Sequence, residues 1–392
     1  MLTAEENALL TQVGPGSPCG ELLRRYWQPV AKLSDLSDAT PTKFVRILGE
    51  DLVLFKDKSG RVGLLADHCS HRGASLLYGR VEERGIACAY HGWLYDTEGN
   101  CLETPAEPDG SMFCLTVKQR AYPVREHYGL YWAYMGPLPA PSLIRWDALE
   151  LGLKSVGGPS RFDCNWLQVM ENHMDQSHVF ILHQDTAQRG VDGLSTARGR
   201  IEALEELEYR EVPVGIKRKQ VHRSGYVDTD VMTFPNVQRV YDMFLINVPV
   251  DDAHTMRFIP IADVGLGDWW AGRERDDAGP GRDTQARPIT KNPPNAIHPN
   301  ATYRMSGGTQ AQDLMALETQ GHIADRTVER LATSDRGIVM YREMLEREIQ
   351  RVQQGLDPLG VVRDPQPEPV DTDIHNWIEM TRRFPPVRTA AR

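Results

Sequence analysis

The sequence predicts an α+β protein in which a small all-β domain precedes a larger α+β domain with an antiparallel sheet flanked by helices. Three observations support this class. Short β-type runs separated by turn residues fill residues 44–134. Pro137, Pro139 and Pro141 then indicate a linker. Beyond the linker, a clear strand pattern at 237–250 occurs together with helical patterns, as expected for the α+β class.

The elements follow this order along the chain. Residues 3–13 have an amphipathic helical pattern that ends at the Gly-Pro-Gly turn of residues 14–16. We therefore expect residues 1–42 to form a helical clasp that packs on the larger domain. The all-β domain is expected at 43–140 and the larger domain at 141–392. The expected strands of the all-β domain span residues 44–48, 52–56, 62–66 and 130–134.

Two segments of the larger domain have a marked character. A long helix is predicted at 335–354, with one apolar face made of Ile338, Tyr341, Leu345 and Ile349. Residues 272–300 are rich in Pro, Gly, Asp and Arg without any periodicity, which predicts a long mobile loop or lid.

Composition excludes several classes of function. The chain is 41% hydrophobic and 25% charged, as in ordinary globular proteins, and its net charge of −10 provides no basic field for nucleic acid or an anionic membrane. No apolar run is long enough to span a membrane and no leader peptide is recognisable, so we expect a cytoplasmic protein. Six cysteines without a repeated pattern do not indicate a disulfide framework.

The first candidate metal-binding motif follows the expected strand at 62–66. Cys69 and His71 precede Cys88 and His91, so that each of two short loops contributes one thiolate and one imidazole. Two thiolates on one iron and two imidazoles on the other are the ligands of a Rieske [2Fe–2S] cluster. The sequence therefore predicts such a cluster in the all-β domain.

Structural zinc is the competing interpretation, because two Cys and two His are also a zinc-finger set. Zinc fingers usually pair Cys with Cys and His with His, whereas here each loop has one of each. Gly73 after the first pair and Gly92-Trp93 after the second also predict tight turns and an apolar cover over a cluster. These features favour iron and sulfur.

A second set of ligands lies downstream, where His173, His178 and His183 occur within eleven residues. A mononuclear Fe(II) that activates O₂ needs two His and one carboxylate on one face. We expect His178 and His183 to supply the imidazoles. Because a five-residue step turns a helix by about 140° beyond one full turn, the helix must end or distort before His183. From the residues alone, Asp313 is the best carboxylate and Glu318 and Asp325 are the alternatives.

Asp175 lies three residues before His178 and can share its helical face. One interpretation is a carboxylate that accepts a proton from a ligand imidazole and links it to the cluster of a neighbouring molecule through His91. The other is an exposed helix residue without a function.

With both ligand sets, the chain resembles the oxygenase components of Rieske non-haem iron ring-hydroxylating oxygenases, in the phthalate dioxygenase-like branch that includes aromatic O-demethylases. The resemblance covers nearly the whole length. It rests on motifs around residues 13–16, 23–30, 67–76, 90–93, 165–168, 248–252 and 320–326. It implies that Asp313 is the third iron ligand.

The resemblance also implies partners. It implies a homotrimer or two stacked trimers, in which the Rieske domain of one subunit passes electrons to the iron of the next through Asp175. A flavin- and ferredoxin-containing reductase would supply electrons from NADH or NADPH, and Arg72, Arg80 and Arg84 are candidates for its docking patch.

The resemblance implies an enzyme that uses O₂ to hydroxylate or O-demethylate a carboxylated aromatic compound. Phthalate-type cis-dihydroxylation is the alternative reaction. Bulky apolar residues at 179–181 make phthalate itself a poor expectation. Arg218, Lys219 and Arg239 are candidates for binding an anionic aromatic, because guanidinium binds carboxylate through paired hydrogen bonds.

Two other classes of function compete with an oxygenase. A Rieske electron carrier without its own catalysis would need only about the first 140 residues, so the long second part argues against it. A zinc-dependent hydrolase would contain zinc and no acid-labile sulfide.

Overall fold

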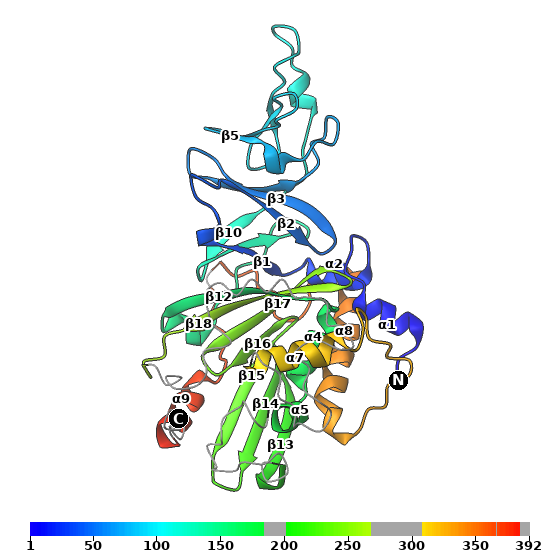
Figure 1. Ribbon diagram of the computed structural model, residues 1–392, viewed down its shortest axis with the longest axis vertical. Helices are drawn as coiled ribbons and strands as arrows, with labels where there is room; N and C mark the ends of the chain where they lie inside the picture. The colour runs from blue at the N-terminus through cyan, green and yellow to red at the C-terminus, as the bar shows by residue number, and fades with distance from the viewer. Residues whose placement is uncertain (184–200, 268–307, 366, 385–392) are drawn as a thin grey trace.

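The computed structural model describes residues 1–183, 201–267, 308–365 and 367–384. The molecule is elongated, with small sheets stacked at one end and a large sheet with helices at the other (Figure 1). The expected loop at 272–300 lies outside the described residues. The order of an all-β part followed by an antiparallel sheet with helices confirms the predicted fold class.

Three small antiparallel sheets build the N-terminal part, with orders β1-β11-β10, β2-β3-β4-β9 and β5-β6-β7-β8. The four strands predicted between residues 44 and 134 all form, as β2, β3, β4 and β11. The strands of these sheets are β1 (Trp27–Lys32), β2 (Thr42–Ile47), β3 (Glu50–Lys56), β4 (Val62–Ala66), β5 (Arg80–Glu82), β6 (Gly85–Ala87), β7 (Leu94–Tyr95), β8 (Cys101–Glu103), β9 (Ala121–Tyr122), β10 (Val124–His127) and β11 (Leu130–Tyr134).

A seven-stranded antiparallel sheet is the centre of the C-terminal part, with the order β12-β18-β17-β16-β15-β14-β13. Its strands are β12 (Leu153–Phe162), β13 (Leu204–Val212), β14 (Gly215–His222), β15 (Val227–Thr233), β16 (Val237–Val240), β17 (Met243–Asp251) and β18 (His254–Ala262). The prediction of a single strand at 237–250 is wrong in one respect. This segment forms a hairpin of two strands, β16 and β17, because Tyr241 adopts a positive φ of 58° and the chain reverses there.

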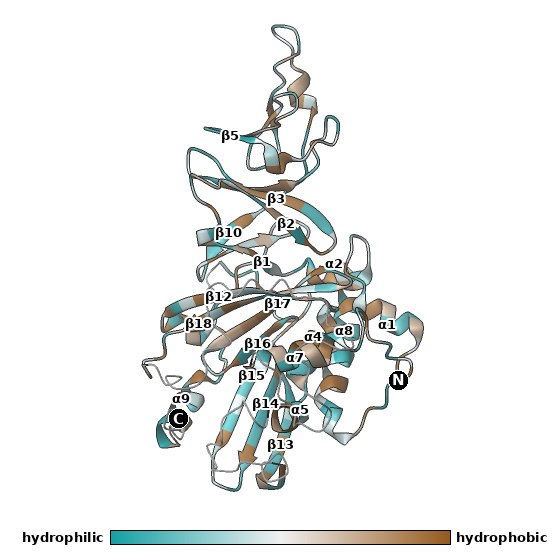
Figure 2. Ribbon diagram, in the orientation of Figure 1, coloured by the Kyte–Doolittle hydropathy of each residue, from teal (hydrophilic) through white to brown (hydrophobic). Residues whose placement is uncertain are grey.

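Helices flank this sheet. The α-helices are α1 (Ala4–Thr11), α2 (Pro18–Leu23), α3 (Asp147–Glu150), α4 (Trp166–Met174), α5 (Ser177–Ile181), α7 (Gly308–Glu318), α8 (Arg336–Gln353) and α9 (Ile374–Arg383), and the 3₁₀ turns are η1 (Leu33–Asp35), η2 (Leu76–Tyr78), η3 (Phe113–Thr116) and η5 (Thr333–Asp335). Helix α4 packs on β17 and β18, and Figure 2 shows hydrophobic residues along both α4 and β17. On β15, Asn376 of α9 binds Thr229.

The long helix at 335–354 is confirmed as α8. Tyr341, Leu345 and Ile349 of its predicted apolar face are fully buried, and Ile338 packs against the same core. Burial of large apolar side chains is the main favourable term in folding, so this face anchors α8 to α2 and α4.

Backbone hydrogen bonds join the two parts of the chain. The amides of Leu48 and Gly49, in the turn between β2 and β3, donate to the carbonyls of Pro249 and Val250 in β17. Beside this junction Glu50 binds Arg24 at 2.9 Å. The stack of small sheets is thereby tied to the sheet that carries the second candidate site.

Candidate metal centres

Two loops with the same backbone pattern present the first ligand set. In one, the amide of Gly73 donates to the carbonyl of Cys69, and in the other the amide of Gly92 donates to the carbonyl of Cys88. Both glycines adopt a positive φ, 74° and 75°, which few other residues tolerate. The tight turns expected at these glycines are confirmed.

The four side chains from these loops form two contacting pairs, one of thiols and one of imidazoles. The thiols of Cys69 and Cys88 are buried and contact each other, whereas the rings of His71 and His91 lie nearer the surface with centroids 4.5 Å apart. Burial raises the pKa of the Cys88 thiol, so a bound metal is what would hold it as thiolate. The buried ring of Trp93 stacks on the ring of His71, with the two centroids 4.2 Å apart.

Polar groups also converge on this site. The hydroxyl of Tyr95 lies 3.2 Å from Cys69 Sγ and 3.0 Å from Ser70 Oγ. The amide of Ser70 donates to Gln119, whose own side-chain amide donates to the carbonyls of Ala66, at the end of β4, and of His68, just before the first loop. Buried sulfur on one side and accessible imidazole on the other fit a cluster with two thiolate and two imidazole ligands.

The second ligand set depends on a break between two helices. Helix α4 ends at Met174, Asp175 is extended, and α5 runs only from Ser177 to Ile181. His178 therefore lies in the first turn of α5 and His183 lies beyond its end. The prediction that the helix ends before His183 is confirmed, and this ending turns both imidazoles toward α7.

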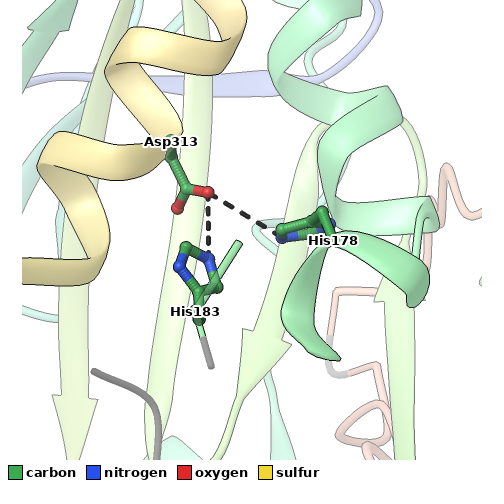
Figure 3. Close-up of side chains that lie close together, drawn as sticks. All are labelled: His178, His183 and Asp313. Atoms are coloured by element: carbon green, nitrogen blue, oxygen red, sulfur yellow. Dashed lines mark ion pairs between the residues drawn. The ribbon is translucent and has the colours of Figure 1, made fainter. Parts of the chain in front are cut away.

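Asp313 of α7 completes a group of three (Figure 3). Its Oδ1 lies 3.1 Å from His183 Nε2 and 3.8 Å from His178 Nε2, and one ligand atom from each of the three residues lies within 4.8 Å of the others. Two ligands at ~2.1 Å from a metal and 90° apart are separated by about 3.0 Å. The residues thus fit one metal ion bound by two imidazoles and one carboxylate.

The electrostatics of the group favour an ionised carboxylate. Burial opposes ionisation of Asp313, but His183 and His178 outweigh it and lower the pKa of Asp313. The pKa of Asp175 is also lowered. Burial raises this pKa, but His178 and the hydrogen bond from the Ser177 amide lower it by more than burial raises it. Asp175 Oδ2 lies 3.5 Å from His178 Nδ1, within electrostatic contact but beyond a normal hydrogen bond.

His173 has a different environment from the other two histidines. Its Nε2 lies 3.2 Å from Nη2 of Arg257, whose guanidinium stacks over Phe162 at 4.4 Å and donates to Asn247. Burial and the positive charge of Arg257 hold the pKa of His173 well below its usual value. A neutral His173 therefore supports the helix beside the site without joining the group of three.

Sequence reasoning missed three neighbours of the site. Gln312 accepts a hydrogen bond from His183 at 2.8 Å, Asn172 donates to Asp313 at 3.4 Å, and Arg257 contributes the positive charge described above. The sequence offered a signal for two of them. Gln312 directly precedes Asp313, and Asn172 directly precedes His173, in the segment that was rich in histidine.

The alternative carboxylates lie elsewhere. Glu318 accepts a hydrogen bond from the amide of Asp163, and exposed Asp325 caps the following turn through Thr327. Neither joins the histidines among the described residues.

The arginines and the lysine considered for substrate binding have partners already. Arg218 is partly buried and binds Asp230 and Gln176, Lys219 binds Glu206 near the surface, and Arg239 donates to three backbone carbonyls. These contacts explain each charge without a ligand.

The three arginines near the cluster loops are exposed. Arg80 pairs with Glu82 and Arg84 pairs with Glu103, whereas Arg72 lies over the ring of exposed Tyr90. A basic docking patch made of these residues stays a prediction.

Comparisons with known proteins agree with this geometry. Residues 26–123 match the Rieske [2Fe-2S] domain and residues 215–372 match a domain described as LigXa C-terminal domain like. The 5,5'-dehydrodivanillate O-demethylase oxygenase subunit of Sphingobium sp. (strain NBRC 103272 / SYK-6) is 37% identical over 389 residues, covering 93% of this chain and 84% of that protein. The chain belongs to the Rieske oxygenase family.

Other members are similar over comparable lengths. The phthalate 4,5-dioxygenase oxygenase subunit of Pseudomonas putida is 33% identical over 393 residues, covering 92% of this chain and 89% of that protein. The solved structure of NdmA from Pseudomonas putida CBB5 has a TM-score of 0.62 at 20% identity and covers 90% of this chain and 98% of its own. At that identity the likeness shows the fold alone.

This Rieske oxygenase is thus the oxygenase component of a multicomponent oxidoreductase. Its cofactors are a Rieske [2Fe–2S] cluster and a mononuclear non-haem iron. Oxygenase components of such systems work with a small-molecule substrate and a reductase or ferredoxin partner. Among the described residues, no helix combines the length and the apolar character that a membrane crossing requires.

Proposed function

We propose that His178, His183 and Asp313 bind the mononuclear iron, and that Cys69, His71, Cys88 and His91 bind the cluster. The single observation that carries the first assignment is the convergence of two imidazoles and one ionised carboxylate within 4.8 Å. Such an iron supplies O₂ activation, because three protein ligands on one face leave positions open. Asp313 provides the negative charge and the two histidines provide neutral nitrogen donors.

The proposed reaction is hydroxylation or O-demethylation of a carboxylated aromatic compound. Three relatives that match over more than 80% of their own lengths are named for dehydrodivanillate, phenoxybenzoate and phthalate, all of which are aromatic carboxylates. The similarity to phthalate 4,5-dioxygenase keeps aromatic cis-dihydroxylation as a second candidate reaction.

The position of the two centres supports electron transfer between subunits. In Figure 1 the cluster loops beside β5 lie toward one end of the elongated molecule, and the helices α5 and α7 lie toward the other. We propose a homotrimer, alone or as two stacked trimers, in which Asp175 links His178 to His91 of the partner subunit. The proposal also includes a cytoplasmic location, where NADH or NADPH and reducing conditions are available.

A single-turnover experiment tests the reaction. Reduced, iron-replete protein is mixed with O₂ and either a methoxylated benzoate or phthalate, and formaldehyde and hydroxylated products are measured. Formaldehyde from the methoxylated acid supports O-demethylation, and a diol supports cis-dihydroxylation. Absence of product from every aromatic acid, with both metal centres occupied, contradicts the proposed substrate class.

The variant His183→Ala tests the iron assignment in the same assay. Loss of product with an unchanged visible spectrum of the cluster supports an oxygenase that uses His183. Unchanged product formation contradicts the assignment.

A further inference from the structure

Two consecutive residues of α7 contact the two nitrogens of one imidazole. Oε1 of Gln312 lies 2.8 Å from Nδ1 of His183, and Oδ1 of Asp313 lies 3.1 Å from Nε2 of the same ring. All three side chains are buried, with Gln312 at 0% exposure and His183 at 3%. The ring is therefore held from both sides by one helix.

This geometry has a consequence for the proton of the imidazole. A neutral imidazole carries its proton on one nitrogen and offers a lone pair on the other, and only the lone pair can bind a metal. An amide oxygen accepts a hydrogen bond and so favours the proton on Nδ1. The lone pair is then on Nε2, which is the nitrogen that faces Asp313 and His178.

We propose that Gln312 is a positioning residue that holds His183 in the Nδ1-protonated tautomer and in the ring orientation that binds iron. The inference rests on the proposed assignment of His183 as an iron ligand. Hydrogen-bond partners of metal-binding imidazoles orient the ring and increase its basicity, and their loss typically weakens metal binding.

The amide also affects the charge of the site. Many imidazole ligands of metals donate to a carboxylate, whereas Gln312 is neutral. Asp313 therefore remains the only carboxylate within the group of three. A second carboxylate at position 312 would keep the hydrogen-bond acceptor and add a negative charge behind the ring.

Two substitutions separate hydrogen bonding from packing. Gln312→Met retains the length and flexibility of the side chain but removes the acceptor, and Gln312→Glu retains an acceptor. Gln310→Met is the matched control, because Gln310 lies in the same helix, is only half-buried and lies about 160° around the helix from Gln312. Far-UV circular dichroism reports folding of the full-length protein in each variant.

The measurement is the affinity for Fe(II), determined by competition with a chromophoric chelator. Absorption of Co(II) bound in place of iron reports the coordination geometry. We expect Gln312→Met to bind Fe(II) about 10- to 100-fold more weakly and to change the Co(II) spectrum. Gln312→Glu should recover most of the affinity, and Gln310→Met should match the wild type.

The outcomes distinguish the inference from the proposed function. If Asp313→Ala binds Fe(II) as well as the wild type, the assignment of the iron ligands fails. If Asp313→Ala loses the metal while Gln312→Met retains wild-type affinity, the role of Gln312 is wrong. If Gln312→Glu is no better than Gln312→Met in folded protein, Gln312 acts only by packing and the inference is overturned.

Discussion

A buried ion network behind the iron site should contribute strongly to stability. Glu171, on α4 two residues before His173, binds Arg326 at 2.7 and 2.9 Å and Arg342 at 2.7 Å. Exposure is 9% for Glu171, 1% for Arg326 and 5% for Arg342, so solvent screens these contacts little. Arg326 also binds Asn7, which links the network to the N-terminal helix.

The perturbation is Glu171→Gln, which keeps the shape of the side chain and removes its charge. Removing one partner of a buried ion pair typically costs about 3–5 kcal/mol, since the remaining charge stays buried. Arg342 retains Glu329 as a partner, whereas within the described part of the chain Arg326 retains the neutral acceptors Asn7 and Ala324, so Arg326 accounts for most of the loss. At about 2–4 °C per kcal/mol for a unit of 150–250 residues, the expected decrease in Tm is about 6–20 °C.

The assay is thermal unfolding followed by far-UV circular dichroism at one fixed scan rate, because a chain of this size can unfold irreversibly. Visible absorbance of the cluster, recorded in the same scan, shows whether the Rieske end melts separately. The matched control is Glu82→Gln, which removes the partner of exposed Arg80 and should leave Tm unchanged. Equal shifts for the two variants would refute the assignment of stability to the buried network.

Three further predictions concern the two metal centres. Asp175→Asn should retain both metals but lower steady-state turnover about 10- to 100-fold, because the carboxylate beside His178 is lost; full turnover with both metals present would exclude a bridge. Tyr95→Phe should keep the spectral shape of the cluster and lower its reduction potential, since a hydrogen-bond donor near Cys69 Sγ stabilises the reduced, more negative state; an unchanged potential in redox titration would exclude this contact. Removal of the mononuclear iron by a chelator should abolish product while the cluster spectrum persists, and added Fe(II) should restore activity; activity that survives removal would place the chemistry elsewhere.

Much of the fold and of both sites could be predicted from the chain because the signals are local. Cys69 and His71 lie two residues apart in one loop, and the two glycine turns follow from short-range steric limits on the backbone. The five-residue spacing of His178 and His183 predicted the helix end that α5 has. The apolar face of α8 followed from a period of 3.6 residues.

Other features depended on contacts between distant residues. The residues alone left Asp313, Glu318 and Asp325 open, and the packing of α7 against α4 brings Asp313 to the histidines. The strand pattern at 237–250 did not reveal its hairpin, because both strands are buried and their patterns run together.

The sequence by itself determined the class of metal centres, since ligand type and short spacing are properties of a contiguous segment. The tertiary structure decided which charges have partners, because Arg218 pairs with Asp230 of the next strand and Arg239 donates to carbonyls from other strands and loops. It also brought Gln312 to His183 across 129 residues of chain. Packing selects such contacts by burial and hydrogen bonding over the whole domain, and no local spacing specifies them.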